Sequence, residues 1–233
     1  MTRLSVVVPA HDEEELIEAC VSSLLRSREH LAVLAPGVAC GVVVVLDACT
    51  DDTGDRLRRF GAEVDVVEVS RRSVGAARRA GAERALALAG PDDHWLAQTD
   101  ADSVVPEHWL ARHLAALTAG VDLLLGTVVP DLSTFDDAQR EQWRVTHPAG
   151  TAGNTHGANL GISAEAYARI GGYANLPEHE DVDLVRRVRA AGGRVESTPD
   201  IPVSTSSRRV GRTPGGYAGF LRTAYPLHAE ART

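Results

Sequence analysis

The sequence predicts one α/β domain, in which helices flank a doubly wound sheet. Three observations support this fold class: short β-branched runs alternate with helical patterns, the Val-rich runs are almost uninterrupted, and 233 residues suffice for one large hydrophobic core. Almost uninterrupted apolar runs are typical of strands that are buried on both faces. Strands that alternate with helices in this way form right-handed βαβ units with parallel strands.

The first half of the chain consists of strand–helix pairs. Short runs rich in β-branched or aromatic side chains predict strands over residues 4–8, 42–46, 64–69 and 95–98. In the segments that follow, apolar residues recur at helical spacing, which predicts helices over residues 13–28, 51–60, 74–88 and 107–117. This order indicates a sheet that is covered on both faces.

The second half of the chain is less regular. The sequence predicts a strand over residues 121–129 and helices over residues 136–145 and 181–191, the second of which ends at Gly192 and Gly193. Residues 151–161 are rich in Gly, Asn and Thr, which indicates a loop that enters a short strand. Residues 202–219 contain few apolar side chains, so we expect a mobile loop there, followed by a short terminal helix.

The charged residues exclude two classes of enzyme. The chain has 24 basic and 32 acidic residues, for a net charge of −8, and every basic residue is Arg. Without Lys, the chain has neither the Walker-type phosphate loop nor the amine of a Schiff-base enzyme. Net acidity with scattered Arg also argues against a nucleic-acid partner.

Cysteine and apolar patterns bear on the compartment. The three cysteines Cys20, Cys40 and Cys49 have neither metal-ligand spacing nor the even count of a disulfide framework, which predicts a reducing, cytoplasmic location. The longest uncharged stretch, residues 31–46, is too short to span a bilayer and is interrupted by Pro and Gly. The N-terminus resembles a first strand more than a signal peptide, so we expect no transmembrane segment.

Acidic side chains follow three of the four predicted strands. Glu13 comes shortly after the first strand, Asp47 ends the second, and Asp100 and Asp102 follow the fourth. Ligands of open α/β sheets bind beyond the carboxyl ends of the strands. Two carboxylates at this spacing repel each other unless a cation or hydrogen-bond donors lie between them, and an all-oxygen site suits Mg²⁺ or Mn²⁺. The alternative is that these strand ends are ordinary polar loops.

Six sequence blocks follow one another between about residues 3 and 200. They are LSVVVPAHDEE from Leu4, VLDACTDDT from Val45, GAARRAG from Gly75, DAD from Asp100, GANLGI from Gly157 with GGY soon after it, and EDVDLVRR from Glu180. In content and order these blocks resemble the inverting glycosyltransferases of family 2. The resemblance implies a GT-A fold, a Rossmann-like doubly wound mixed sheet flanked by helices, in a single domain over residues 1–233.

The resemblance implies sugar transfer from a nucleoside diphosphate sugar, which we expect to be UDP-linked, to an acceptor hydroxyl with inversion. Asp181 would be the general base, and Glu180 would orient it or bind an acceptor hydroxyl. Asp102 would bind a Mn²⁺ or Mg²⁺ cofactor that offsets the charge of the leaving diphosphate. Asp100 would share this metal or reach the ribose. Acidic residues also favour helix N-termini without any catalytic role, which is the alternative for residues 180 and 181.

The resemblance divides the domain into parts. Residues 1–103 would bind the nucleotide sugar, residues 104–200 would bind the acceptor and carry the catalytic helix, and residues 201–233 would form the C-terminal loop and helix. The further candidates for donor binding are Pro9, Ala10, His11, Glu13, Asp47 (to the base), Arg78 (to phosphate), Asp100 and Ala101. The candidates for the acceptor side and the C-terminal loop are His156, Asn159, Arg208 and Arg209.

One departure from the family leaves two alternatives for the metal. Many relatives supply a third ligand, often His, from the C-terminal loop, whereas this chain has no His there before His228. Either the two carboxylates, the diphosphate and water hold the metal, or the Arg residues of the loop take over part of its role. With no membrane helix, we expect a single transfer to a small soluble or lipid-linked acceptor; the oligomeric state is open.

Rival functions lack their motifs. A sugar nucleotidyltransferase would have a Gly-rich loop after the first strand and commonly a Lys on the phosphates, and an oxidoreductase would have G-x-G-x-x-G there. Neither pattern follows Pro9. A non-catalytic member that binds a nucleotide sugar is the remaining alternative.

Overall fold

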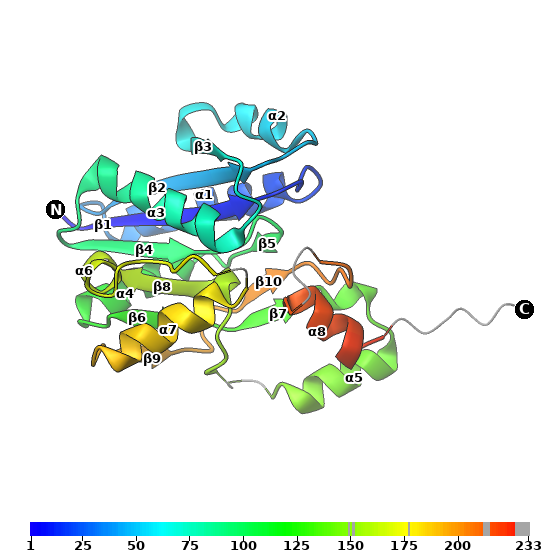
Figure 1. Cartoon of the computed structure of the whole chain (residues 1–233). Coiled ribbons are helices and arrows are strands. Elements are labelled where there is room, and N and C mark those ends of the chain that lie inside the picture. Colours follow the sequence, from blue (N-terminus) through cyan, green and yellow to red (C-terminus); the bar gives the residue numbers. More distant parts are fainter. Residues whose placement is uncertain (149, 151, 177, 212–214, 227–233) are drawn as a thin grey trace, which may run out of the picture.

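The computed structural model describes residues 1–148, 150, 152–176, 178–211 and 215–226 (Figure 1). Within them, the main sheet has seven strands in the order β3-β2-β1-β4-β8-β6-β9. Along this order the strands are β3 (Asp65–Val69), β2 (Ala39–Asp47), β1 (Arg3–Ala10), β4 (His94–Gln98), β8 (Leu160–Ser163), β6 (Leu123–Leu125) and β9 (Val195–Ser197).

Strand directions make the sheet mixed. β1 pairs in parallel with both β2 and β4, with Val6 opposite Val42 and Ala97, and β2 pairs in parallel with β3. β8 runs antiparallel to its neighbours β4 and β6. The predicted doubly wound mixed sheet is therefore confirmed, and the carboxyl ends of β1, β2 and β4 meet at one edge.

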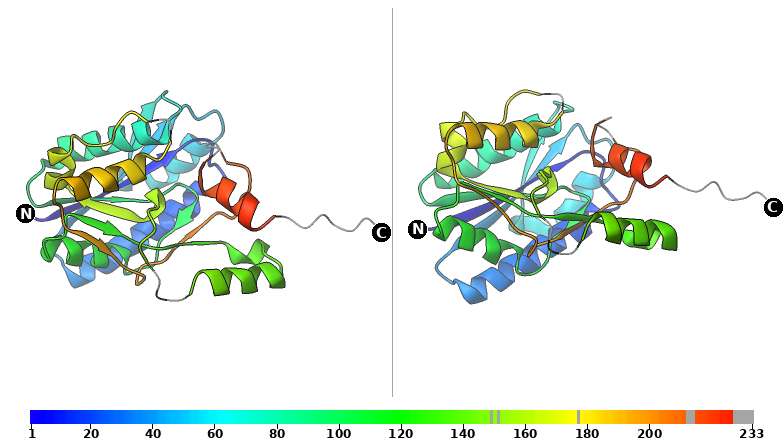
Figure 2. Two further views of the ribbon diagram at one scale, coloured as in Figure 1. Left: turned by 60° about the horizontal axis from the view of Figure 1, so that its bottom comes forward. Right: turned by 90° about the horizontal axis from the view of Figure 1, so that it is seen from below.

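Two hydrophobic cores lie on opposite faces of the sheet because successive side chains of a strand point to opposite faces. Val6 and Val44 pack with α1 and α4, whereas Val43 and Val45 pack with α3, α6 and α7. Figure 2 shows these two helical layers with the sheet between them. The helices are α1 (Ile17–Leu34), α4 (Trp109–Thr118), α3 (Val74–Ala89), α6 (Ala164–Arg169) and α7 (Glu180–Ala190).

The predicted strand over residues 121–129 is wrong, because two strands in different sheets divide this segment. β6 belongs to the main sheet, and β7 (Val128–Pro130) belongs to a second sheet of order β5-β10-β7, with β5 (Ser103–Val104) and β10 (Val203–Thr205). The chain changes sheet at Gly126 and Thr127, where the buried Asn159 amide donates to the Thr127 carbonyl at 2.8 Å. A Cβ on Gly126 would lie 2.2 Å from that amide, so the passage requires glycine.

The expected loop over residues 202–219 is also partly wrong, because Val203–Thr205 form β10 between β5 and β7. Ile201 and Val203 are fully buried and anchor this strand. The sequence pattern misses it because Val203 is the only apolar residue of this three-residue strand. Residues 212–214 and 227–233 lie outside the described residues, and the expected terminal helix is α8 (Tyr217–Ala224).

Two helix predictions need different bounds. α1 begins at Ile17, because residues 13–16 form a turn in which Leu16 and Ile17 donate to the Glu13 carbonyl, and it continues to Leu34. The predicted helix over residues 51–60 is the short α2 (Thr53–Leu57) followed by a 3₁₀ helix, Arg58–Glu63. Gly61 ends helical geometry there with φ of 52°.

A small helical unit stands at the carboxyl ends of the strands. It consists of α5 (Asp137–Thr146) and α8, which pack through Phe135, Trp143, Leu221 and Tyr225 (Figure 1). Two further 3₁₀ turns, Leu132–Thr134 and Gly157–Asn159, lead into α5 and β8. Across the described part of the chain, no helix has the length and apolar character needed to cross a membrane.

Candidate active site

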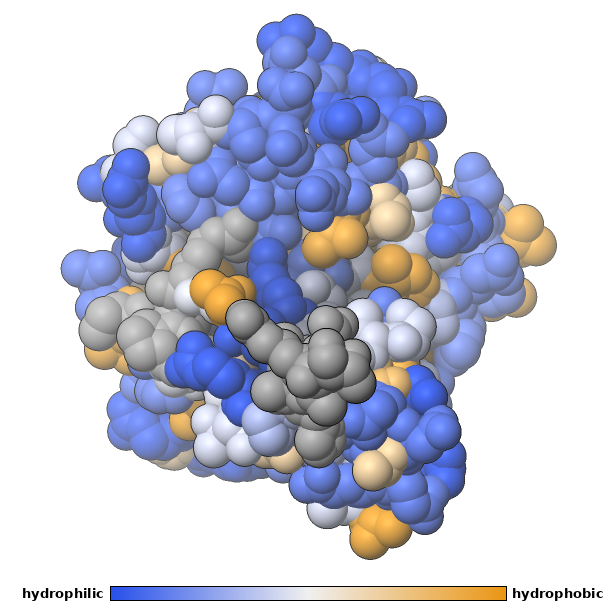
Figure 3. Space-filling model, turned by 90° about the vertical axis from the view of Figure 1, so that its right-hand side faces the viewer, coloured by the Kyte–Doolittle hydropathy of each residue, from blue (hydrophilic) through white to orange (hydrophobic). Residues whose placement is uncertain are grey.

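A cavity of about 1360 Å³ opens at the carboxyl ends of β1, β2 and β4. Figure 3 shows this face of the molecule, which is largely hydrophilic, with isolated apolar patches around a hollow. The cavity exceeds the roughly 300–1,000 Å³ typical of a single small-molecule site, so it has room for two substrates. Most predicted site residues line it: Pro9, Ala10, His11, Glu13, Asp47, Arg78, Asp100, Ala101, Asp102, His156, Glu180, Asp181 and Arg208.

Asp47 organises the part of the cavity beside the N-terminus of α3. Its buried carboxylate accepts hydrogen bonds from the backbone N–H groups of Arg71, Arg72 and Ser73 at 2.6, 2.8 and 2.8 Å. The Ser73 side chain then caps α3, and a ring nitrogen of His11 contacts the Asp47 carbonyl oxygen. Asp47 therefore fixes the loop that enters α3, a role that the sequence did not suggest.

Arg78 occupies a buried position between three partners, contrary to the expectation of a phosphate contact. Its guanidinium donates to Asp100, to Glu180 at 3.3 Å and to the Gln98 side-chain oxygen at 3.2 Å. A Cβ on Gly157 would lie 2.6 Å from this guanidinium, so protein atoms enclose it. Burial opposes its charge, but Asp100 and other negative neighbours outweigh burial and raise the pKa of Arg78.

Arg208 bridges two acidic residues at the entrance of the donor side. Its two terminal nitrogens donate to the buried Glu13 carboxylate at 3.0 and 2.7 Å, and one of them also lies 2.8 Å from Asp102 Oδ2. The Thr205 hydroxyl donates to Asp102 Oδ1 at 3.2 Å, which ties β10 to the same carboxylate. The C-terminal segment thus places a guanidinium beside Asp102.

Asp100 and Asp102 fit a divalent cation that other ligands complete. Burial and the negative charge of Asp100 raise the pKa of Asp102, although Arg208 lowers it. A divalent cation would offset this repulsion between the two carboxylates. Arg78 contacts one oxygen of Asp100, whereas Arg208 contacts Oδ2 of Asp102 and the Ser103 and Thr205 hydroxyls donate to its Oδ1. Mg²⁺ characteristically binds one or two carboxylates together with phosphate oxygens and water. These residues therefore suit a shared site better than an all-protein one.

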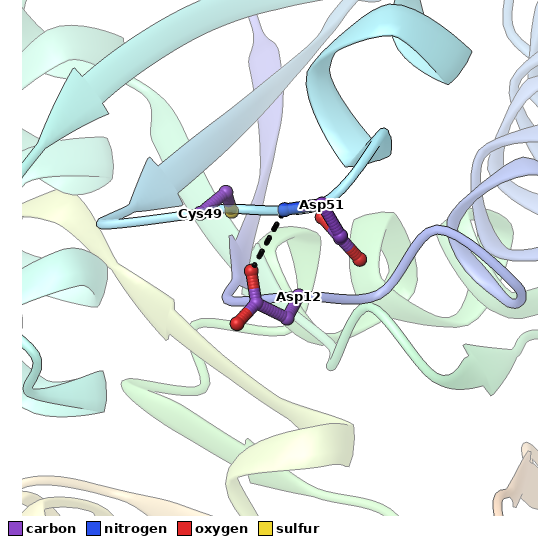
Figure 4. Close-up of side chains that lie close together, drawn as sticks. All are labelled: Asp12, Cys49 and Asp51. Atoms are coloured by element: carbon purple, nitrogen blue, oxygen red, sulfur yellow. Dashed lines mark hydrogen bonds between the residues drawn. The ribbon is translucent and has the colours of Figure 1, made fainter.

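A second acidic group lies near the cavity, at the turn after β2. Asp12, Cys49 and Asp51 bring one potential ligand atom each within 4.8 Å of the others (Figure 4). However, Asp12 accepts from the Thr50 and Asp51 backbone N–H groups, which outweigh burial and lower its pKa. Asp51 likewise accepts from Thr53 at 3.0 Å. These hydrogen bonds explain why the three side chains lie together: they connect the turn after β1 with the turn after β2.

Asp181 lies on the cavity wall at the start of α7 and is held by backbone groups. One carboxylate oxygen accepts from the Gly157 N–H at 2.7 Å, and the other accepts from the Val182 N–H at 2.7 Å. A carboxylate has about four acceptor positions, so two remain for a ligand. The helix N-terminus also favours negative charge.

Glu180 turns inward from Asp181. It is only 6% exposed and contacts the Arg78 guanidinium, which links α7 to α3. Burial and the charge of Asp181 raise the pKa of Glu180 even though Arg78 opposes the shift. A Cβ on Gly75 would lie 3.0 Å from the Glu180 Cβ, so glycine permits this close approach. The geometry fits a residue that positions Asp181 better than one that binds an acceptor.

Two predicted acceptor-side residues do not line the cavity. Asn159 is fully buried, donates to Thr127 and Ile201 carbonyl oxygens, and accepts from Trp109 Nε1 at 2.9 Å. Arg209 donates to the Tyr225 carbonyl at 2.7 Å and lies over the Phe135 ring. Both side chains therefore join elements of the fold, because their polar groups are used by the backbone and by aromatic rings.

His156 lines the cavity as expected, and four aromatic or heterocyclic side chains that the sequence analysis missed lie on the same wall: Trp143, His147, Tyr217 and Phe220. The sequence does contain a signal for this wall, because five of the ten Phe, Trp and Tyr residues lie in or beside α5 and α8. Gln98 and Tyr173 were not predicted either; the Tyr173 hydroxyl donates to the Gln98 side-chain oxygen at 2.7 Å beneath Arg78. Nothing in the sequence pairs these two residues.

Comparison with protein families gives a decisive match. The model of "Glycosyl transferase family 2" matches residues 5–168, more than half of the chain. The chain belongs to glycosyl transferase family 2. This family 2 glycosyltransferase has no significant match among curated proteins.

Solved structures confirm the GT-A fold of the glycosyltransferase. TarS 1-349 of S. aureus in complex with UDP-GlcNAc is 16% identical with a TM-score of 0.68, over 93% of this chain and 62% of that TarS fragment. The mannosyltransferase PcManGT from Pyrobaculum calidifontis, in complex with GDP-Man and Mn²⁺, is 22% identical with a TM-score of 0.64, over 90% and 58%. Glucosyl-3-phosphoglycerate synthase from Mycobacterium tuberculosis, with Mn²⁺, UDP and phosphoglyceric acid, is 18% identical with a TM-score of 0.55, over 84% and 68%. The chain thus spans about six-tenths of the TarS and PcManGT structures.

Proposed function

We propose that this glycosyltransferase moves a sugar from a nucleoside diphosphate sugar, preferentially UDP-linked, to an acceptor hydroxyl with inversion. The observation that carries the proposal is the position of Asp181, which shares one cavity with Asp100 and Asp102 and keeps free acceptor positions on its carboxylate. A general base needs a carboxylate within hydrogen-bond reach of the hydroxyl that it deprotonates. The size of the cavity supports a site that holds donor and acceptor together.

The donor would lie on the first half of the chain, residues 1–103. Ser73 and Val74 at the N-terminus of α3 line the cavity, and the N–H groups of a helix N-terminus favour phosphate. The complexes of TarS, PcManGT and the mycobacterial synthase with nucleotides or nucleotide sugars support this placement. Asp100 and Asp102 would hold Mn²⁺ or Mg²⁺, which when bound neutralises charge on the leaving diphosphate.

The chain's own residues account for the proton transfer. Asp181 takes the proton of the acceptor hydroxyl as its oxygen bonds to the anomeric carbon of the donor, and the bond from that carbon to the diphosphate breaks. Glu180 and Arg78 keep Asp181 in place through α7 and α3. Attack from the face opposite the diphosphate inverts the anomeric configuration.

The three cysteines are free, which supports the cytoplasmic location that we propose.

The proposed function is tested by thermal unfolding of the full chain with UDP, GDP or dTDP, each with and without Mn²⁺. A ligand at about 100 times its Kd adds about 2.7 kcal/mol, which raises the midpoint by roughly 5–10 °C for a chain of this size.

A Mn²⁺-dependent shift with one nucleotide, followed by release of that nucleotide from its sugar conjugate in the presence of an acceptor, would support transfer. A shift without turnover of any donor would indicate a non-catalytic nucleotide-sugar-binding protein. No shift with any nucleotide would contradict the proposal.

A further inference from the structure

One wall of the cavity is an array of aromatic and imidazole rings from α5, α8 and the segment before β8. Trp143 and His147 are stacked, with ring centroids 3.7 Å apart and planes within 7°. Phe220 meets His147 and Tyr217 at centroid distances of 6.3 and 5.8 Å, and Tyr217 meets His156 at 5.8 Å. All five rings line the cavity and form a continuous surface, which we call the aromatic wall.

The aromatic wall contains no Arg or Lys side chain that would bind an anion. Among the described residues that line the cavity, the arginines are Arg72, Arg78 and Arg208, and all three belong to the donor side. Arg78 and Arg208 are already paired with carboxylates. Burial lowers the pKa of His156 despite the nearby Asp181, so its imidazole is neutral at neutral pH.

The chemistry beside the aromatic wall is acidic. Glu178 and Asp181 line the cavity next to it. These carboxylates repel a phosphate or carboxylate group, whereas aromatic faces bind flat apolar surfaces by stacking and area burial. An uncharged ring therefore matches both the charge and the shape of this part of the cavity.

We propose that the acceptor of this glycosyltransferase is an uncharged molecule with a flat ring, which stacks on the aromatic wall and presents a hydroxyl to Asp181. The inference rests on the proposed function and specifies its acceptor class. A sugar ring and an aromatic ring share this chemistry, and the experiment separates them. The same argument predicts that anionic acceptors bind more weakly.

The test is a binding measurement on the full chain with saturating UDP and Mn²⁺. Saturation-transfer NMR titrations with phenyl β-glucoside, methyl β-glucoside and phosphoglyceric acid give the Kd of each probe and the ligand protons that face the protein. We expect both glucosides to bind and phosphoglyceric acid not to bind. Tighter binding of the phenyl compound would assign the wall to an aryl ring, and equal binding would assign it to the sugar.

Two matched variants locate the binding site. Phe220 is 43% exposed at the edge of the cavity, so Phe220→Ser should fold and should weaken glucoside binding roughly 3- to 10-fold, the range of one aromatic contact. Val145, exposed on α5 but outside the cavity lining, provides the control Val145→Ser, which should change nothing.

Tighter binding of phosphoglyceric acid than of either glucoside, or equal effects of the two substitutions, would overturn the acceptor class. The proposed function has a separate readout, because nucleotide binding and donor turnover do not depend on which acceptor probe binds. Failure of the nucleotides to shift the unfolding midpoint would therefore reject the function, whatever the glucosides do.

Discussion

The guanidinium of Arg208, in the C-terminal segment, lies 2.8 Å from the Asp102 carboxylate, at the proposed metal site. The same guanidinium forms a two-nitrogen contact with Glu13, which is 5% exposed. The Arg residue therefore neutralises charge that a divalent cation would also neutralise. In the nucleotide-free protein, Arg208 and the metal ion should therefore compete for Asp102. A bound diphosphate would contact both of them and end this competition.

This competition predicts the effect of Arg208→Gln on metal binding. Without the guanidinium, Asp102 keeps its negative charge uncompensated, and Mn²⁺ should bind the nucleotide-free protein about tenfold more tightly. The loss of the Glu13 partner should also cost about 1–3 kcal/mol of unfolding free energy. Titration calorimetry with Mn²⁺ measures the first effect and urea unfolding the second.

Arg209→Gln is the matched control, because Arg209 binds the Tyr225 carbonyl and lies outside the cavity lining. It should leave the Mn²⁺ affinity unchanged. An unchanged or weaker Mn²⁺ affinity in the Arg208 variant would show that the guanidinium does not occupy the side of Asp102 that a cation uses.

Asn159→Ala should affect stability and not catalysis. Asn159 makes three buried hydrogen bonds, and its removal leaves the Ile201 carbonyl and the Trp109 N–H without the partner that it supplies, whereas the Thr127 carbonyl still accepts from the Val203 N–H. We expect a loss of about 3–5 kcal/mol in unfolding free energy, from about 1–3 kcal/mol for each unpaired group. The KM for the acceptor should not change in the protein that remains folded.

Asn154→Ala is the control for stability, because Asn154 is exposed and lines the cavity. Its unfolding free energy should stay within about 0.5 kcal/mol of the wild-type value. Urea unfolding that ranks Asn154→Ala as the more damaging substitution would refute the structural role given to Asn159.

His113 should make the protein less stable in mild acid. It is fully buried and accepts from Trp95 Nε1 at 2.9 Å, and burial together with Arg112 lowers its pKa to about 3. Between that value and the unfolded pKa near 6.5, only the unfolded chain binds the proton. The unfolding free energy should therefore fall as pH decreases from about 6.5, by up to about 1.4 kcal/mol per unit from this group.

The variant His113→Asn isolates the effect, because the Asn oxygen can still accept from Trp95. Unfolding free energies measured by urea between pH 7 and 4 should decline less steeply in this variant than in the wild type. His108→Asn, at an exposed position, should keep the wild-type slope. Identical slopes for His113→Asn and the wild type would remove His113 as the cause.

The sequence was sufficient to predict that the residues at the strand ends lie at the cavity. β1, β2 and β4 are marked by Val-rich or apolar runs, and parallel strands bring the residues that follow them to one edge. Asp47, Asp100 and Asp102 were placed at the cavity for this reason. Asp181 was placed only through the resemblance of its motif to the family, because helix-terminal carboxylates are common.

Burial and distant partners were not readable from the sequence. Arg78 was expected to contact phosphate, yet α3 packs so closely on the sheet that a Cβ on Gly81 would lie 2.4 Å from Val7. That close packing buries the inner face of α3, and Glu180, 102 residues away along the chain, provides the counter-charge. Asn159 and Arg209 were misassigned for the same reason, since their partners come from other elements.

The central claim of this account is that Asp181 removes the proton of the acceptor. Asp181→Asn keeps the size of the side chain and one acceptor oxygen but removes the basic carboxylate. Sugar transfer should fall by about 10²–10⁴-fold, the usual contribution of a general base, while the Kd for nucleotide with Mn²⁺ stays unchanged.

Asp183→Asn is the control on the same helix, because Asp183 pairs with Arg186 and Arg187 outside the cavity lining. The decisive measurement is the single-turnover rate of sugar transfer in these two variants, beside donor binding by calorimetry. The account predicts a large loss of rate in Asp181→Asn alone, with donor binding intact. Wild-type rates in Asp181→Asn would contradict it.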